Sequence, residues 1–277
     1  MSKLRQAVPV TALLAIVVAS GWVLAGAAAG QSAAAPAGGQ AGAPVVIELF
    51  TSQGCSSCPP ADRVLSELGH DGSAGPVIPL AYHVDYWDHL GWSDPFSSKR
   101  WSERQEGYAH TLGHDGVATP ELVIDGRSDC VGSRRDEVLS KIAAARAQEP
   151  AARVDLSLGA PTGGGRHQKL PVKVSAQTLR QTGNADPEVW VALTQSGLST
   201  AVKSGENAST TLRDDYVVRR LQKAFKLSKS AGAQRDGEVD LELDPSWPPA
   251  ALTVVAFVQD PKSLAIVGGA SSPVVKP

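Results

Sequence analysis

The sequence predicts two fold classes in one chain: an α/β domain over residues 44–149, followed by an all-β antiparallel domain of sandwich-like type over residues 150–277. In the first region, short apolar runs alternate with segments of helical periodicity, which is typical of parallel strands connected by helices. From about residue 150, apolar residues instead occupy every second position between clusters of Gly, Pro, Asn and Asp, as in antiparallel sheets. The 277 residues are enough for two such cores.

The predicted α/β domain begins with two strands and two helices. The apolar, β-branched run over residues 45–50 predicts a buried parallel strand. The following helix has an apolar face made of Ala61, Val64, Leu65 and Leu68. Residues 77–84 then predict a second strand. Ser97 or Ser98 is expected to cap a second helix, whose inner face carries Trp101, Gln105, Tyr108 and Leu112.

A hairpin and a last helix complete this domain. Residues 121–124 and 127–131 flank Asp125-Gly126, a dipeptide that favours a tight type I′ turn between antiparallel strands. Ser133, with Asp136 three residues later, resembles a capping box that opens a helix. The order of elements is therefore βαβαββα, which is that of a thioredoxin-like domain.

Residues 150–277 are predicted to fold mainly as strands. Period-two alternation or a short apolar run marks each of the segments 154–158, 170–174, 189–193, 239–243, 252–258 and 264–267. Strands at this spacing, without long helices, suggest an antiparallel sandwich of roughly seven strands. Residues 214–225 fit either a helical turn or a long strand, and both interpretations remain open.

The N-terminus resembles an export signal over residues 1–27. Two basic residues precede an apolar run over residues 8–23, and Ala25-Gly26-Ala27 offers the small residues that a signal peptidase recognises. An uncleaved anchor formed by residues 8–27 is the alternative, because the run approaches the roughly 20 residues that span a bilayer. Either way we expect an exported protein, periplasmic or secreted. Residues 28–43, rich in Ala, Gly, Gln and Pro, are expected to form a disordered tether.

Charge and composition argue against several partners. The chain has 26 Lys and Arg against 28 Asp and Glu, a net charge of −2, so no overall field attracts nucleic acid or an anionic membrane. The basic residues are scattered rather than arranged in a stripe with aromatic residues, as a nucleic-acid groove requires. We expect no nucleic-acid partner, no cofactor, and no membrane contact beyond a possible N-terminal anchor.

Cys55 and Cys58 form a Cys-x-x-Cys motif between the first strand and the first helix. Free backbone N–H groups and the helix dipole stabilise a thiolate at such a position. Pro59 and Pro60 lack N–H groups and fit only the first turn of a helix, so they place both cysteines at its positive end. Cys55 is the expected attacking thiolate, and Cys58 is the expected resolving thiol.

The dipeptide Thr119-Pro120 precedes the third predicted strand. In a thioredoxin-like domain this is where a cis-proline packs against the dithiol, and X–Pro is the bond for which the cis form costs little. A cis bond would leave the Thr119 backbone free to pair with an extended substrate. An ordinary proline that opens a strand is the alternative. The Cys-x-x-Cys one βαβ unit upstream favours the substrate-docking interpretation.

The loop after the second strand is a third candidate. It leaves the strand at its carboxyl end, the edge of an open α/β sheet that carries ligand sites and also Cys55. We expect four of its residues to wall the site and contact substrate, with Asp85 or His83 as a proton shuttle: His83, Asp85, Trp87 and Trp92. An equally weighted interpretation is that the aromatic residues cover the core, because a loop this apolar is costly to leave exposed.

Cys130 is the odd third cysteine. An exported compartment is oxidising, so Cys55 and Cys58 can persist there as a disulfide, and Cys130 is expected to be a small buried apolar residue on the fourth strand. The rival chemistry is a zinc or copper site made of Cys55, Cys58, His83 and Cys130. We assign no metal, because the sequence has neither a second Cys-x-x-Cys nor a His-x₃-His pair.

These motifs together resemble the exported thioredoxin-like proteins of domain-of-unknown-function family 1223. The resemblance extends over nearly all of the mature chain. Its longest segments are ELFTSQGCSSCPPAD (residues 48–62) and HVDYWDHLGW (83–92), and the others are 94–96, 119–120, 125–127, 131–133, 197–200, 205–207, 211–213 and 217–219. It implies a thioredoxin-like domain joined to a β-rich one and no settled activity. Such proteins more often carry an aromatic or other apolar residue at the position of Cys130.

The predicted function is an extracytoplasmic thiol–disulfide oxidoreductase that acts on a protein or a small thiol. Cys55 would attack, Cys58 would resolve, and Pro120 would orient the partner. Two alternatives stay open: an exported binding protein in which the Cys-x-x-Cys is a structural disulfide, and a copper or zinc carrier.

A last expectation concerns the contact between the two halves. Gly205 permits a tight turn and Asn207 can bond its neighbouring backbone. Together they could bring Glu206 and Arg213 back toward the first domain. We therefore expect this loop and the loop over residues 85–92 to meet close to the dithiol.

Overall fold

The computed structural model describes residues 43–164 and 168–275 and assigns them three α-helices, short 3-10 turns and thirteen strands. The helices are α1 (Pro59–Asp71), α2 (Lys99–Leu112) and α3 (Arg135–Arg146). The strands before residue 150 are β1 (Val45–Thr51), β2 (Val77–His83), β3 (Glu121–Ile124) and β4 (Ser128–Val131). The later strands are β5 (Ala152–Leu158), β6 (Gln168–Thr178), β7 (Glu188–Gln195), β8 (Leu198–Ala201), β9 (Thr211–Asp214), β10 (Val217–Lys226), β11 (Gln234–Leu243), β12 (Leu252–Gln259) and β13 (Ile266–Pro273).

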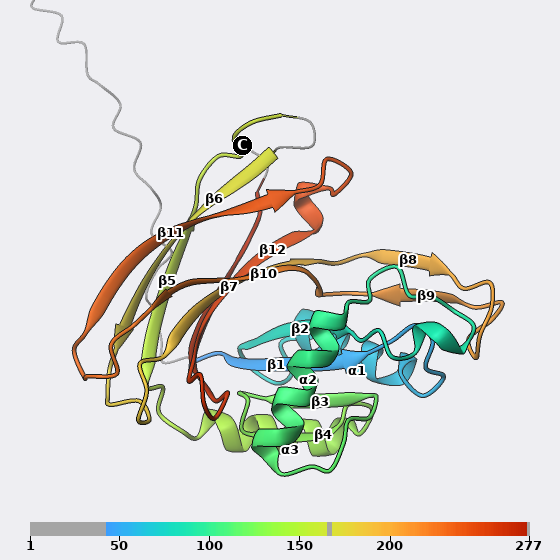
Figure 1. Cartoon of the computed structure of the whole chain (residues 1–277), viewed down its shortest axis with the longest axis horizontal. Coiled ribbons are helices and arrows are strands. Elements are labelled where there is room, and N and C mark those ends of the chain that lie inside the picture. Colours follow the sequence, from blue (N-terminus) through green and yellow to red (C-terminus); the bar gives the residue numbers. More distant parts are fainter. Residues whose placement is uncertain (1–42, 165–167, 276–277) are drawn as a thin grey trace, which may run out of the picture. The chain divides into compact units, whose positions relative to one another are not determined.

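One mixed sheet of eight strands runs through both halves of the chain, in the order β13-β12-β7-β10-β2-β1-β3-β4 (Figure 1). The two halves join where β10 lies parallel to β2: Val217 pairs with Ala81, and the Ala81 N–H donates to the Tyr216 carbonyl at 2.9 Å. The predicted fold class, a βαβαββα thioredoxin-like domain followed by a separate sandwich-like domain, is therefore wrong. The first seven elements occur in the predicted order, but the free edge of β2 continues into the β-rich half.

Three layers surround this sheet. One face is covered by α2, and its core contains residues from both halves, such as Phe50, Tyr108, Val218 and Phe257. The opposite face of β1 to β4 is covered by α1 and α3. The opposite face of β7 and β12 is covered by a second sheet, β11-β6-β5, so that the apolar run of β12 is buried on both sides.

A narrow arm of two strands, β8 and β9, extends from this body toward the carboxyl end of β1 (Figure 1). It interrupts the path from β7 to β10 and carries the loop over residues 202–210 at its tip. The segment that allowed two interpretations, residues 214–225, is mostly strand β10.

Helix boundaries follow the expected chemistry in two cases and depart from it in the third. Helix α1 begins with Pro59 and Pro60 directly after Cys58. Helix α2 is capped by Ser98, whose hydroxyl accepts the N–H of Arg100 at 3.3 Å. Helix α3 begins at Arg135 without a side-chain cap, so the predicted capping box at Ser133 does not form.

The predicted export signal over residues 1–27, and nearly all of the predicted tether over residues 28–43, lie outside the described residues. Within the part of the chain that the structure describes, no helix is long and apolar enough to cross a membrane.

Candidate functional site

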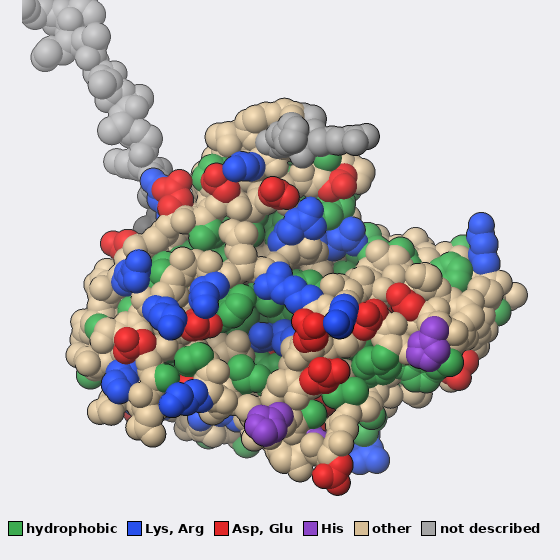
Figure 2. All heavy atoms as spheres, viewed as in Figure 1, with side chains coloured by type: hydrophobic (Ala, Val, Ile, Leu, Met, Phe, Trp, Pro, Cys, Tyr) green, Lys and Arg blue, Asp and Glu red, His purple; other side chains and the backbone are tan. Residues whose placement is uncertain are grey.

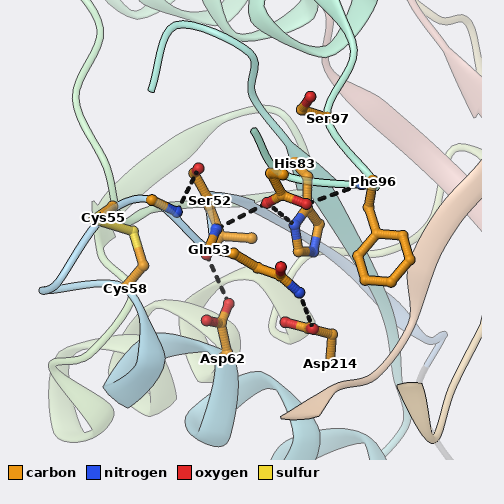
Figure 3. Close-up of polar contacts among 12 residues, drawn as sticks. Ser52, Gln53, Cys55, Cys58, Asp62, His83, Phe96, Ser97 and Asp214 are labelled. Atoms are coloured by element: carbon orange, nitrogen blue, oxygen red, sulfur yellow. Dashed lines mark hydrogen bonds and ion pairs between the residues drawn. A yellow bond between two sulfur atoms is a disulfide. The ribbon is translucent and has the colours of Figure 1, made fainter. Parts of the chain in front are cut away.

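The disulfide between Cys55 and Cys58 lies between the carboxyl end of β1 and the first turn of α1 (Figure 3). The turn is held by the N–H of Cys55 on the Ser52 carbonyl (3.1 Å) and the N–H of Cys58 on the Cys55 carbonyl (3.2 Å). Both cysteines are fully buried. Ser56 and Ser57 between them are exposed, so the surface of the motif is polar and the sulfur atoms lie beneath it.

An ion pair lies beside the disulfide loop. His83, the last residue of β2, is 1% exposed, and its Nδ1 lies 2.7 Å from Oδ2 of Asp94. The same carboxylate oxygen accepts the backbone N–H of Gln53 at 2.8 Å, and Oδ1 accepts the N–H of Phe96 at 2.9 Å. Asp94 thus connects β2 to the strand-to-helix turn that carries the cysteines.

Two further carboxylates complete the group. Asp62, one helical turn after Cys58, accepts the Thr51 hydroxyl at 2.7 Å. Asp214, at the end of β9, is 3% exposed and accepts the side-chain amide of Gln53 at 2.7 Å. We call Asp62, His83, Asp94 and Asp214 the acid–imidazole cluster. Figure 3 shows Asp62, His83 and Asp214 beside the disulfide loop, around Gln53.

Burial and mutual repulsion shift the pKa values in this cluster. Burial, followed by the charge of Asp214, raises the pKa of Asp62 to about 7. Burial favours the neutral ring of His83, but the carboxylates of Asp94, Asp214 and Asp62, with Asp94 the largest, together outweigh it and raise the pKa of His83 to about 9. Burial also opposes ionisation of Asp94, yet His83 and the backbone N–H groups hold the pKa of that carboxyl below its usual value. The cluster therefore combines a hydrogen-bonded imidazole–carboxylate pair with two carboxyl groups, Asp62 and Asp214, whose pKa values burial raises.

One polar atom of this cluster has no partner. Nε2 of His83 is buried and forms no hydrogen bond within the described part of the chain. The imidazole ring also has an apolar neighbour: the rings of His83 and Phe96 meet edge to face with centroids 5.4 Å apart.

The loop at the tip of the β8–β9 arm covers the disulfide turn. The side-chain amide of Asn207, 9% exposed, donates to the carbonyls of Gln53 (2.9 Å) and Cys55 (3.0 Å). The carboxylate of Glu206 accepts the N–H of Ser56 at 3.0 Å. The expected approach of this loop and of Glu206 to the dithiol is confirmed, but that of Arg213 is wrong. Arg213 is exposed on β9 and is not part of this contact.

The loop after β2 meets the same tip. The hydroxyl of Ser204 donates to the Gly91 carbonyl at 2.6 Å. Gly205 has a φ of +78°, and a Cβ atom there would lie 3.0 Å from Cβ of Trp92, so both the backbone conformation and the close approach favour glycine. The indole N–H of Trp92 donates to the side-chain carbonyl of Gln53 at 3.2 Å.

The bond between Thr119 and Pro120 is cis, as the sequence predicts. Trp87 connects this segment to the disulfide turn. Its indole N–H donates to the Thr119 hydroxyl at 2.9 Å, and its Cβ would lie 3.1 Å from a Cβ on Gly54. Asp85 points elsewhere, since its carboxylate accepts the hydroxyl of Ser102 on α2 at 2.5 Å. Of the four loop residues singled out, His83, Trp87 and Trp92 therefore lie at the disulfide turn.

Cys130 lies on β4 in the core beneath α1 and α3, 7% exposed, and burial raises the pKa of its thiol to about 11. The expectation of a small buried apolar residue is confirmed. The rival ligand set of Cys55, Cys58, His83 and Cys130 does not assemble among the described residues. The group whose donor atoms lie within 4.8 Å of one another is a different one: His114, Glu121 and Asp129.

Sequence reasoning missed Gln53, Asp62, Asp94 and Asp214 as members of the site. One signal was present for Asp62, which lies three residues before Leu65 and so borders the apolar face of its helix. No local pattern marks Asp94 or Asp214, because their burial depends on β10 joining β2 and on the path of two loops.

Two solved structures share this fold. A crystal structure of a protein from Agrobacterium tumefaciens is 27% identical, with a TM-score of 0.62 over 86% of this chain and 98% of that one. HBP35 of Porphyromonas gingivalis is 16% identical, with a TM-score of 0.62 over 84% of this chain and 76% of that one. The second likeness shows the fold alone. The comparison with curated proteins found no match.

The comparison with protein families covers most of the described chain and both of its halves. The profile described as "Protein of unknown function (DUF1223)" matches residues 46–259, from β1 to the end of β12. The matched residues include both cysteines, the acid–imidazole cluster and the covering loop. The chain therefore belongs to the DUF1223 family.

Proposed function

We propose that this protein is an extracytoplasmic thiol–disulfide oxidoreductase in which Cys55 and Cys58 alternate between disulfide and dithiol. The observation that carries the proposal is the acid–imidazole cluster beside the disulfide. Buried charges are costly to fold, and titratable groups with strongly shifted pKa values concentrate at functional sites. A disulfide that only cross-links the chain does not require a group that exchanges protons near neutral pH, such as Asp62, one helical turn away.

The exchange proceeds in two steps. A thiolate of the partner attacks Sγ of Cys55, the S–S bond breaks, and Cys58 leaves as a thiolate that takes up a proton. The second thiol of the partner then loses its proton. The resulting thiolate attacks the partner's first sulfur atom, which is bonded to Cys55 in the mixed disulfide, and releases Cys55 as a thiolate. The partner loses two electrons and becomes a disulfide, and the Cys55–Cys58 pair gains them. Run in reverse, the same steps reduce the partner.

Three features support the assignment of roles. The first turn of α1 stabilises a thiolate on either cysteine through its dipole and N–H groups. Asp62, with a pKa raised to about 7, is about half protonated at neutral pH and can supply the proton for Cys58. Thr119 and Pro120, linked to the turn through Trp87, would dock the partner's backbone.

Access is the step that the covering loop controls. Both cysteines are buried, and Asn207 of the loop over residues 202–210 is bonded to the Gln53 and Cys55 carbonyls, so in this proposal the partner's thiolate reaches Cys55 when the loop leaves the disulfide turn. The same burial favours a second candidate function, a binding protein in which the disulfide is structural and never opens.

A redox titration of the mature chain in glutathione buffers separates the two functions. We expect a reduction potential well above about −300 mV for the oxidoreductase, and a value below it for a structural disulfide.

A trapping experiment tests the roles of the two cysteines. Cys58→Ser should accumulate a mixed disulfide on Cys55 with a small-molecule disulfide, because the first attack survives and the resolving attack is lost. Trapping on Cys58 alone, in the Cys55→Ser variant, would reverse the two roles.

A further inference from the structure

A groove outside the disulfide site runs between the start of α2 and strand β10. It has a volume of about 480 Å³ and is lined mainly by residues 95–101 and 218–222. An adjoining cavity of about 290 Å³ shares Arg100, Trp101 and Leu221 with it. Figure 2 shows Lys and Arg side chains gathered over α2 and β10, around a hollow in which hydrophobic side chains are visible. This size is that of a small-molecule site.

Three guanidinium groups line the groove: Arg100, Arg219 and Arg220. Within the part of the chain that the structure describes, none of them forms an ion pair with a carboxylate. Nη1 of Arg219 is buried and has no hydrogen-bond acceptor there. The carboxylate whose charge acts on Arg219 and Arg220 is Asp244, which is exposed and held by Ser246. The groove therefore holds positive charge in excess of what the protein neutralises.

Aromatic rings hold these guanidinium groups in place. The Arg219 guanidinium lies between the rings of Phe96 (5.0 Å) and Trp247 (4.8 Å), and Arg220 lies 4.9 Å from Trp247. Such stacking fixes the planar groups at little entropic cost. Nη1 of Arg220 donates to the Arg219 carbonyl at 2.9 Å, and the stacked arrangement leaves the other N–H groups along the guanidinium edges to face a ligand. Arg100 stacks on Trp101 at 5.3 Å on the opposite wall.

The remaining lining is apolar or carries neutral hydrogen-bonding groups. Trp101, Val218 and Leu221 are buried side chains that line the groove, and Ser97, Ser98 and Gln222 offer hydroxyls and an amide. Helix α2 begins here after its Ser98 cap, so the positive end of its dipole adds to the field of the arginines. An apolar floor beneath a rim of cations suits a ligand that has an apolar body and a negative end.

We propose that this groove binds a small organic anion whose carboxylate or phosphate pairs with Arg219, Arg220 and Arg100, and whose apolar, planar body lies over Trp101 and Leu221. The site is separate from the disulfide, because the Phe96 ring stands between Arg219 and His83. Binding there requires no thiol chemistry, so this inference goes beyond the proposed function and does not depend on it.

The test is isothermal titration of the mature chain with 2-naphthoate, and with 2-naphthalenemethanol as the uncharged probe of the same ring. We expect saturable binding of naphthoate that weakens with added salt, and much weaker binding of the alcohol. Arg219→Gln and Arg100→Gln should each weaken naphthoate binding about tenfold, the loss expected for one charged hydrogen bond. Arg100 is exposed, so its variant tests the site even if Arg219→Gln perturbs folding.

Arg153→Gln is the matched control, because it removes the same charge from an exposed pair on β5 outside the groove. It should leave naphthoate binding unchanged. Equal affinity for naphthoate and the alcohol would overturn the proposal, as would equal weakening by the Arg153 control. Absence of saturable naphthoate binding to the wild-type chain would overturn it as well.

Discussion

Asn207→Ala should unlock the loop that covers the disulfide. The side-chain amide of Asn207 makes two hydrogen bonds, to the carbonyls of Gln53 and Cys55. At about 1 kcal/mol for each net hydrogen bond, the closed loop loses about 2 kcal/mol. That difference raises the population of the open loop about thirtyfold.

The rate of disulfide reduction reports that population. We would incubate the folded chain with a low concentration of dithiothreitol, block the released thiols with an alkylating agent, and follow the reduced fraction by mass spectrometry. If reduction occurs from the open loop, Asn207→Ala should be reduced about thirtyfold faster than the wild type. The control is Asn184→Ala, an exposed asparagine between β6 and β7, which should not change the rate. An unchanged rate in Asn207→Ala would refute the idea that this loop shields Cys55.

Three other perturbations test the cluster and the core. Asp62 and His83 have pKa values raised to about 7 and about 9, so their stabilising contributions are present at low pH and are lost as pH rises through those values. Urea unfolding should therefore show lower stability at pH 8 than at pH 5, and Asp62→Asn should reduce the fall whereas Asp155→Asn, on an exposed residue, should not. Gly126 and Gly113 both have positive φ, but only at Gly126 would a Cβ overlap a backbone atom, the Leu264 carbonyl oxygen. Gly126→Ala should therefore lower the melting temperature far more than Gly113→Ala, and equal losses would show that the clash is relieved. Glu48→Gln should cost about 3–5 kcal/mol of stability, because it leaves Arg104 charged and largely buried without its partner at 2.7 Å. Glu48→Gln combined with Arg104→Met should recover part of that loss in chemical denaturation.

The elements before residue 150 could be predicted because each carries a local signal. The run before Cys55 is buried on both faces as β1, and Ser98 and the Asp125-Gly126 turn act where the sequence places them. The partner of an edge strand has no local signal. Alternation shows which residues of a strand face a core, but it does not show which neighbour the strand pairs with. One clue was available: residues 252–258 are apolar at nearly every position, which predicts cover on both faces rather than the single buried face of a sandwich strand.

The candidate site divides in the same way. The cysteines, the cis-proline segment and His83 could be predicted, because each lies at a strand end in the sequence: the cysteines follow β1, His83 ends β2, and Thr119-Pro120 precedes β3. Asp94 and Asp214 could not, since the first becomes buried through loop contacts with Gln53 and the second arrives from the far end of β9. Asn207 was predicted to lie near the dithiol from its turn chemistry, although the two hydrogen bonds that it forms could be known only from the structure.

The join between β2 and β10 explains why the second half of the chain belongs to the site. Strand β10 lies beside β2. Asp215, two residues before β10, therefore lies close to α1 and accepts the Ser66 hydroxyl at 2.5 Å. Asp214, one residue earlier, accepts the side-chain amide of Gln53. The arm of β8 and β9, which ends at Asp214, lies beside the disulfide turn. The fourth carboxylate of the acid–imidazole cluster and the loop that bonds the disulfide turn therefore both come from the half of the chain that this strand pairing joins to the first. A thiol pair on the first 149 residues alone would keep Asp62, His83 and Asp94 but would lack Asp214 and Asn207, which both come from beyond that point.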